Sequence, residues 1–171
     1  MLTAFPPTDE ALAAVAERLG AALREHQWRL ATAESCTGGL VGHAITGISG
    51  SSDYYVGGVI CYWDRAKEVE LGVSHELLAE HGAVSAPVAA AMADGVRKRF
   101  GVEIGVAVTG VAGPDGGSAD KPVGLVYVAA ARRGHPPVVN RQVWPFDRDG
   151  NKRASTLRVL EVALAEVEAA A

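Results

Sequence analysis

The stretch Leu30-Ala31-Thr32-Ala33-Glu34-Ser35-Cys36-Thr37-Gly38-Gly39-Leu40-Val41 decides the fold of this chain. The residues from Trp28 to Ala33 predict a short strand, and the apolar residues that begin at Leu40 predict a helix. A strand, a tight glycine-bearing turn and a helix in succession form the repeating unit of α/β sheets. Ligands of open α/β sheets bind beyond the carboxyl ends of the strands, so this turn is the first candidate for a functional site.

The rest of the chain continues the alternation of strands and helices. Apolar residues at helical spacing predict a first helix from Thr8 or Asp9 to Arg24. Ser85, with Pro87 in the first turn, predicts the start of a helix that runs to Phe100. We further expect strands at 54–62, 104–108, 123–131 and 138–143, short helices at 66–71 and 76–80, and a final helix at 149–170. The sequence therefore predicts a single α/β/α domain over residues 1–171, with a mostly parallel, mixed sheet flanked by helices.

The composition excludes several classes of protein. With 49% hydrophobic and 21% charged residues, the 171-residue chain can bury a core and is not a disordered tail. Its net charge of −4 argues against a general nucleic-acid binder, and its two cysteines argue against a disulfide framework or a Cys-rich zinc site. No secretory signal is visible, and no apolar run approaches the ~20 residues that span a bilayer. We therefore expect a cytoplasmic protein without nucleic-acid or membrane partners.

Two glycine-bearing loops are candidates for ligand binding. The helix after Thr37 offers free N–H groups, which suit a phosphate or the oxyanion that develops beside a nucleophile such as Ser35. A simple N-cap role for Ser35 or Thr37 fits this segment equally well. The second loop, from Thr109 to Pro122, is rich in glycine and follows a predicted buried strand. Loops of this length in small domains are either functional or disordered, and two prolines favour an ordered, functional loop here.

The usual nucleotide-binding and hydrolase motifs are absent from both loops. Neither loop contains Gly-Lys-Ser/Thr or Gly-x-Gly-x-x-Gly, and Ser35 is not flanked by the glycines of a Gly-x-Ser-x-Gly turn. The five histidines lie outside the loops, and no His-x3-His or Cys-x2-Cys spacing predicts a metal site. A serine at this position therefore needs a different base.

Lys67 and Arg148 are the cationic residues that best fit such a site. A lysine can replace histidine as the base that activates a serine, and Lys67 follows the predicted strand that ends near Tyr62. An exposed helix lysine is the more common role. Arg148 precedes the final helix, and its guanidinium suits a phosphate. A surface ion pair with Asp147 or Asp149 is the alternative.

Five segments occur in one order along the chain and together resemble a known family. They are Thr32-Ala33-Glu34-Ser35-Cys36-Thr37-Gly38-Gly39, Gly50-Ser51-Ser52, Gly82-Ala83-Val84-Ser85, Thr109-Gly110-Val111-Ala112-Gly113-Pro114-Asp115-Gly116-Gly117 and Lys121-Pro122-Val123-Gly124. From about Ala11 to Leu164 the chain resembles the C-terminal domain family of the competence-damage-inducible protein CinA. The resemblance implies a compact α/β/α domain, here without the molybdopterin-binding-like domain that often precedes it.

The resemblance also implies an activity. Characterised members of the family are nicotinamide-nucleotide amidases (PncC), which hydrolyse the carboxamide of nicotinamide mononucleotide to nicotinate mononucleotide and ammonia in pyridine nucleotide recycling. The family motifs assign catalysis to Ser35, Tyr62 and Lys67, with no metal or other cofactor. N–H groups at the start of the helix after Thr37 are expected to stabilise the oxyanion, and Arg148 or Lys121 to face the phosphate. The expected substrate-binding residues are Thr37, Gly38, Gly39, Thr109, Gly110, Gly113, Lys121 and Arg148.

The chain departs from the family pattern close to the residues expected to be catalytic. Trp63, Asp64 and Phe146 stand where the family usually has serine, asparagine and glycine. These departures leave two other functions open: a nucleotide-binding or interaction module that has lost turnover, and an amidase for another small phosphorylated substrate. A homo-oligomer is also expected, and Tyr54 and Tyr55 belong either to its edge or to the core.

Overall fold

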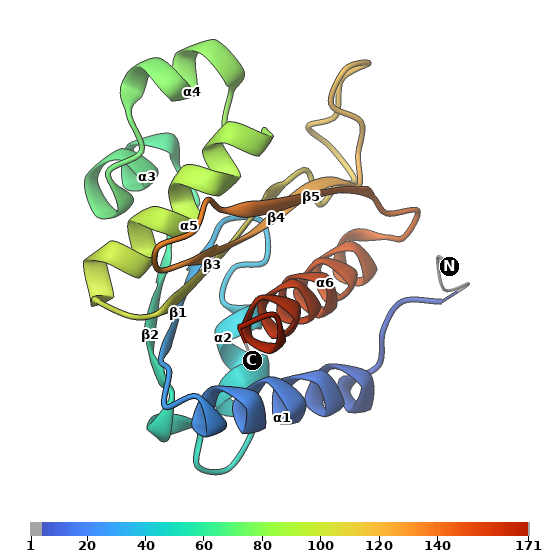
Figure 1. Ribbon diagram of the computed structural model, residues 1–171. Coiled ribbons are helices and arrows are strands. Elements are labelled where there is room, and N and C mark those ends of the chain that lie inside the picture. Colours follow the sequence, from blue (N-terminus) through green and yellow to red (C-terminus); the bar gives the residue numbers. More distant parts are fainter. Residues whose placement is uncertain (1–4, 171) are drawn as a thin grey trace.

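Helices cover both faces of one five-stranded sheet in residues 5–170, which are the residues that the computed structural model describes (Figure 1). The strands are β1 (Leu30–Glu34), β2 (Tyr55–Ile60), β3 (Ile104–Gly110), β4 (Leu125–Arg132) and β5 (Val138–Val143). The helices are α1 (Asp9–Glu25), α2 (Leu40–Thr46), α3 (Asp64–Leu71), α4 (His75–His81), α5 (Ala86–Phe100) and α6 (Arg148–Glu168), with a 3₁₀ turn, η1, at Ser51–Asp53. The predicted α/β/α class and mixed sheet are confirmed.

The order of the strands brings the two predicted loops together. The sheet runs β2-β1-β3-β4-β5, with β1 parallel to both β2 and β3, and with β4 antiparallel to β3 and β5. Glu34 at the end of β1 pairs with Val108 of β3 and with Ile60 of β2. The three parallel strands therefore end at one edge of the sheet, where their following loops meet.

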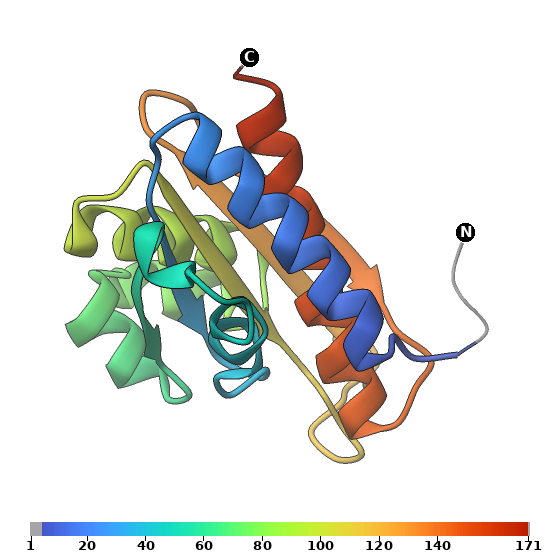
Figure 2. The ribbon, with the colours of Figure 1, turned by 90° about the horizontal axis from the view of Figure 1, so that it is seen from below.

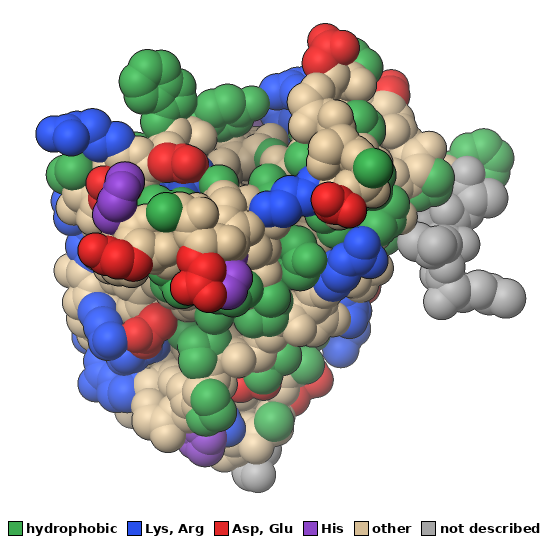
Figure 3. All heavy atoms as spheres, turned by 90° about the horizontal axis from the view of Figure 1, so that it is seen from above, with side chains coloured by type: hydrophobic (Ala, Val, Ile, Leu, Met, Phe, Trp, Pro, Cys, Tyr) green, Lys and Arg blue, Asp and Glu red, His purple; other side chains and the backbone are tan. Residues whose placement is uncertain are grey.

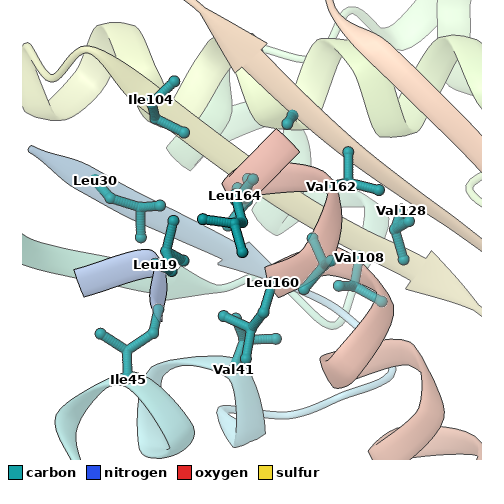
Figure 4. Close-up of a cluster of buried hydrophobic side chains, with 14 of the residues drawn as sticks. Leu19, Leu30, Val41, Ile45, Ile104, Val108, Val128, Leu160, Val162 and Leu164 are labelled. Carbon is teal, nitrogen blue, oxygen red and sulfur yellow. The ribbon is translucent and has the colours of Figure 1, made fainter. Parts of the chain in front are cut away.

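Helices cover both faces of the sheet, and the side chains packed between helix and sheet are larger on one face than on the other. α1, α2 and α6 cover one face through large apolar residues, and α1 and α6 lie side by side (Figures 2 and 4). α5, with α3 and α4, covers the other face, to which β1, β3 and β4 contribute small residues such as Ala31, Ala33, Ala107 and Ala129. None of the described helices is long and apolar enough to cross a membrane.

Capping residues account for most of the helix boundaries. Thr8 accepts a hydrogen bond from the Ala11 amide, Ser85 from Val88 and Asp147 from Gly150. The predicted strand at Trp28 is wrong by two residues. Gln27 adopts a φ of 55°, and the Trp28 amide donates to the Leu23 carbonyl oxygen, so these residues end α1 and the strand begins at Leu30.

Tyr54 belongs to the core and not to an exposed edge. It is 1% exposed and packs in the layer of α1, against Gly20, where an added Cβ would lie 2.5 Å from the Tyr54 hydroxyl oxygen. Tyr55 is half-buried, and its hydroxyl group forms a hydrogen bond with that of Thr32. Of the two alternatives for this pair, the structure favours packing in the core.

Gly105 allows α5 to approach the sheet closely. A Cβ at this position would overlap the carbonyl oxygen of Ala93 and would lie 2.8 Å from the backbone nitrogen of Arg97. Both atoms belong to the backbone of α5, so a side chain at this position in β3 would force the helix away from the strand. The close approach matters for the site because α5 and its preceding loop lie over the end of β3.

We expect Gly105→Ala to lower the free energy of unfolding by about 1–3 kcal/mol, the usual cost of overpacking. Gly47→Ala is the matched control, because a Cβ there meets only ordinary contacts at 3.5 Å and the C-cap φ of −64° suits alanine. Urea unfolding monitored by circular dichroism measures both. Equal stability of the two variants would contradict this account of the α5 packing.

Candidate active site

A cavity of about 260 Å³ lies where the parallel strands end. Ser35, Tyr62, Lys67, Thr109, Gly110, Gly113 and Arg148 are the expected site residues that line it. Cys36, Asp64, Ala83, Val84, Val111, Ala112, Asp115 and Gly116 complete its wall. Figure 3 views the molecule from this side and shows Lys and Arg side chains close to acidic ones beside a projecting lobe. The structure thus brings together the three residues expected to be catalytic and four of the eight expected to bind substrate.

Four expected binding residues, Thr37, Gly38, Gly39 and Lys121, do not line this cavity. Thr37 is fully buried, and its hydroxyl group donates to Glu34. The ammonium group of Lys121 donates to the carbonyl oxygen of His81 at 2.8 Å, which ties the glycine-rich loop to the end of α4. Thr37 and Lys121 therefore have structural partners away from the cavity.

Ser35 is held by its backbone on the first residue after β1. Its amide donates to the Val108 carbonyl oxygen at 3.0 Å, and its own carbonyl oxygen accepts from the Gly38 amide at 3.1 Å. The first bond extends the pairing of β1 with β3 by one residue, and the second closes the turn. The residue is 8% exposed, so its side chain is sheltered but still reaches the cavity.

The carboxylate of Glu34 organises the turn that follows Ser35. It is buried and accepts four hydrogen bonds: from the Thr37 hydroxyl group at 2.7 Å, and from the amides of Gly39, Val41 and Gly42 at 3.0, 3.0 and 2.8 Å. Four donors compensate for burying one negative charge. The same bonds satisfy the free amides at the start of α2.

This network limits which amides of the helix after Thr37 are free to bind an anion. Its first amides were expected to stabilise an oxyanion, but those of Gly39, Val41 and Gly42 already donate to Glu34. The negative charge at this helix N-terminus is therefore the carboxylate of Glu34 itself. An anion near Ser35 cannot use these three amides while they donate to Glu34.

Lys67 is buried in the wall of the cavity and is not a solvated helix lysine. It is 1% exposed, and its Nζ donates to the carbonyl oxygens of Cys61 at 3.0 Å and Tyr62 at 3.3 Å. The chain turns from β2 into α3 around this amine. The Cys61 amide in turn donates to the Glu34 carbonyl oxygen at 2.8 Å, so the ends of β1 and β2 are joined beside Lys67.

Asp64 lies on the open side of the same lysine. Its Oδ1 is 3.6 Å from Lys67 Nζ, and its side chain is 59% exposed. The departure from asparagine at this position thus brings a carboxylate to the buried amine, in contact with solvent. Trp63, which precedes it, is 77% exposed and does not line the cavity.

Arg148 joins Tyr62 to the glycine-rich loop. Its Nη2 donates to the Tyr62 hydroxyl oxygen at 3.0 Å and its Nη1 to the Gly113 carbonyl oxygen at 2.6 Å. Neither Asp147 nor Asp149 takes this guanidinium: Asp147 caps α6, and Asp149 pairs with Arg153. Because the Tyr62 oxygen accepts from Arg148, its own hydroxyl hydrogen remains available to a ligand in the cavity.

Thr109 and the loop after it are held in place from both sides. The Thr109 hydroxyl group donates to the Ala83 carbonyl oxygen at 2.8 Å, which links β3 to the loop between α4 and α5. Val111 and Gly124 pair through their backbones, so the loop leaves and re-enters the sheet at a closed base. This order agrees with the expected functional loop.

The two thiols near the site are unreactive by environment. Burial raises the pKa of Cys36, which lines the cavity next to Ser35, to about 12. Burial also raises the pKa of Cys61 to about 11, although the charge of Lys67 opposes the shift. A thiol is nucleophilic only as its thiolate, so neither cysteine is expected to act as a nucleophile near neutral pH.

A sequence profile of the CinA C-terminal domain matches residues 12–167 of the chain. This chain belongs to the CinA C-terminal domain family. The resemblance of the sequence motifs to that family is thereby confirmed. A crystal structure of the competence/damage-inducible protein CihA from Agrobacterium tumefaciens superposes on this CinA domain with a TM-score of 0.88. The two are 38% identical, over 95% of this chain and 98% of that one.

Curated relatives of this CinA domain fall into two lengths. The nicotinamide-nucleotide amidohydrolase PncC of Escherichia coli is 42% identical over 90% of this chain and 93% of its own. A CinA-like protein of Salinibacter ruber is 50% identical over 85% of this chain, but the match spans only 35% of that relative. The domain therefore occurs in the curated relatives both nearly alone and as part of longer proteins.

Glu34 is the important residue to which the sequence analysis of this CinA domain assigned no role. A carboxylate that precedes a glycine turn and a helix is a recognisable capping signal, because helix N-termini favour negative charge. The cavity residues Ala83 and Val84 carry no such signal. Their contribution depends on the packing of the α4–α5 loop over β3.

We expect Glu34→Ala to lower the free energy of unfolding by about 3 kcal/mol or more, because buried amide donors then lose their acceptor. Glu17→Ala is the matched control, since Glu17 is exposed in the middle of α1 and its loss is expected to change stability by less than about 0.5 kcal/mol. Urea unfolding gives both values. A Glu34→Ala variant as stable as Glu17→Ala would contradict the conclusion that the Glu34 carboxylate stabilises the turn after Ser35.

We expect both thiols of the native domain to resist iodoacetamide at pH 8. Their raised pKa values keep them protonated there, since thiolate forms in quantity only as the pH approaches 11 to 12. Mass spectrometry counts the alkylated cysteines in native and in urea-unfolded protein. Two rapid modifications in urea and none in the native state are expected, and rapid native modification of Cys36 would contradict the burial argument.

Proposed function

We propose that this chain is a nicotinamide-nucleotide amidase, which hydrolyses the carboxamide of nicotinamide mononucleotide to nicotinate mononucleotide and ammonia. The observation that carries the proposal is the buried amine of Lys67 in the wall of the same small cavity as Ser35. The 42% identity to a nicotinamide-nucleotide amidohydrolase over nearly the full length of both chains supports the choice of substrate. The reaction serves the recycling of pyridine nucleotides.

In the first half of the proposed reaction, Ser35 Oγ attacks the carboxamide carbon. Lys67, as the free amine, takes the hydroxyl proton while the new C–O bond forms. The tetrahedral intermediate then breaks its C–N bond, and the proton on Lys67 passes to the leaving nitrogen, which departs as ammonia. Two backbone carbonyl oxygens hold the lysine nitrogen in place, which supports its use as a positioned base.

In the second half, water hydrolyses the ester between Ser35 and the nicotinoyl group. Lys67 takes a proton from the water and returns it to Ser35 Oγ as the acid is released. Tyr62 donates its free hydroxyl hydrogen to the substrate, since its oxygen is already bonded to Arg148. Tyr62 lines the cavity beside Ser35, so its donated hydrogen stabilises the developing oxyanion.

One observation favours a second candidate. The carboxylate of Asp64 lies 3.6 Å from Lys67 Nζ and forms an ion pair with it, and an ammonium group held in such a pair cannot act as a base. A domain arrested in that form is a nucleotide-binding or interaction module without turnover. An amidase for another small phosphorylated substrate is a third candidate, which the same cavity accommodates.

The test is ammonia release from nicotinamide mononucleotide by the purified protein in the presence of EDTA. We expect release by the wild type and a loss of at least about 10³-fold in Ser35→Ala, because the covalent step is then impossible. Ser49→Ala, on an exposed loop residue, is the matched control and is expected to retain full activity.

Each other outcome points to a different candidate. Binding of the nucleotide without ammonia release favours the module without turnover. Release from another phosphorylated carboxamide only favours the third candidate. Activity that survives Ser35→Ala excludes the serine mechanism, and activity that EDTA abolishes excludes a metal-independent one.

A further inference from the structure

A second and larger cavity adjoins the one that contains Ser35. It has a volume of about 610 Å³ and shares Ala112 and Arg148 with the smaller cavity. Pro114, Val123 and Phe146 form its apolar wall, and the first turn of α6 forms its charged wall. Ligand sites usually occupy about 300–1,000 Å³, so the 260 Å³ cavity at Ser35 is small for a nucleotide, and the adjoining cavity supplies the additional room that a ligand of that size requires.

Lys152 and Arg148 face this region from the same side of α6. They are four residues apart, which places them one above the other on a helix. Both line the larger cavity. In the described part of the chain, neither forms an ion pair with a carboxylate, because Arg148 donates to two neutral oxygens and Lys152 has no polar partner within bonding distance.

The two carboxylates of the charged wall are already occupied. Asp147 Oδ1 accepts from the Gly150 amide at 2.8 Å, as the cap of α6. Asp149 Oδ2 accepts from Arg153 Nε at 2.8 Å, and Arg153 also bonds Asp9 of α1. Arg148 and Lys152 therefore form no ion pair with Asp147 or Asp149, although the four residues line the same cavity.

The positive charges of Arg148 and Lys152 act electrostatically on Cys36, the residue that follows Ser35. Although burial dominates and raises the pKa of Cys36, the charges of Arg148 and Lys152 both act to lower it. Lys121, the other cation expected to face the phosphate, is tied to the His81 carbonyl oxygen and lines neither cavity. Of these two lysines, Lys152 is therefore the one that is free to bind an anionic ligand in the cavity.

We propose that Lys152, together with Arg148, forms a phosphate-binding subsite in the larger cavity. This inference rests on the proposed function, in which the carboxamide lies at Ser35. The sugar then packs against Val123 and Phe146, and the phosphate reaches the first turn of α6. Two cations suit a phosphate dianion better than a carboxylate or a neutral group, which makes Lys152 a specificity-determining residue for phosphorylated substrates.

The test measures binding separately from catalysis. Calorimetry compares ribose 5-phosphate with ribose on the wild type, Lys152→Met, Lys152→Arg and the control Lys98→Met. Lys98 is exposed on α5 and pairs with Asp94 in the other helical layer. We expect ribose 5-phosphate alone to bind, with an affinity about tenfold weaker in Lys152→Met, which loses one charged contact, and largely retained in Lys152→Arg and Lys98→Met.

A kinetic comparison separates this subsite from the proposed function. For nicotinamide mononucleotide, Lys152→Met is expected to raise KM about tenfold with little change in kcat, and to leave hydrolysis of the nucleoside without phosphate unchanged. Binding of ribose 5-phosphate through Lys152 without any carboxamide hydrolysis supports the subsite and overturns the function. Hydrolysis with the same KM in Lys152→Met, or wild-type protein that binds ribose and ribose 5-phosphate equally, overturns the subsite.

Discussion

The buried carboxylate of Glu34 is the interaction on which the rest of the site depends. A single negative charge at the end of β1 collects one hydroxyl and three amide donors and thereby determines the path of the chain around Ser35. This arrangement has a chemical cost, because it occupies the N-terminal amides of α2 that similar folds use to bind anions. The positive groups for the proposed phosphorylated substrate therefore come from elsewhere in the chain.

The C-terminal helix supplies those groups. Arg148 reaches Tyr62 and the Gly113 carbonyl oxygen, and Lys152 follows it one turn later on the same wall. The segments that follow β1 and β2 thus contain the residues proposed to react, whereas the first turn of α6 contains those proposed to recognise the phosphate. The two groups of residues are far apart in the sequence, and Arg148 brings them together by contacting both Tyr62 and the loop after β3.

Local signals in the sequence were sufficient for the fold. The cap at Ser85, the glycine turn after Ser35 and the period of the apolar residues in α1 predicted elements that the structure contains.

The arrangement of the site depends on contacts between residues that are distant in the sequence, which the sequence alone does not reveal. Asp64-Arg65-Ala66-Lys67 is a polar sequence typical of an exposed helix, and only the carbonyl oxygens of Cys61 and Tyr62, turned around the amine, bury Lys67. Which cation is free was likewise unpredictable, because the His81 partner of Lys121 is 40 residues away. The homo-oligomer stays a prediction.

The position of α6 has a consequence for synthesis on the ribosome. The helix covers the face of β3 and β4 that carries their larger side chains, and its first turn closes the region around Tyr62, 86 residues earlier in the sequence. A nascent chain in which α6 has not yet left the ribosome therefore exposes this apolar face of the sheet to solvent. Because such long-range contacts form late, we expect the emerging chain to be prone to aggregation until α6 is available to cover this face.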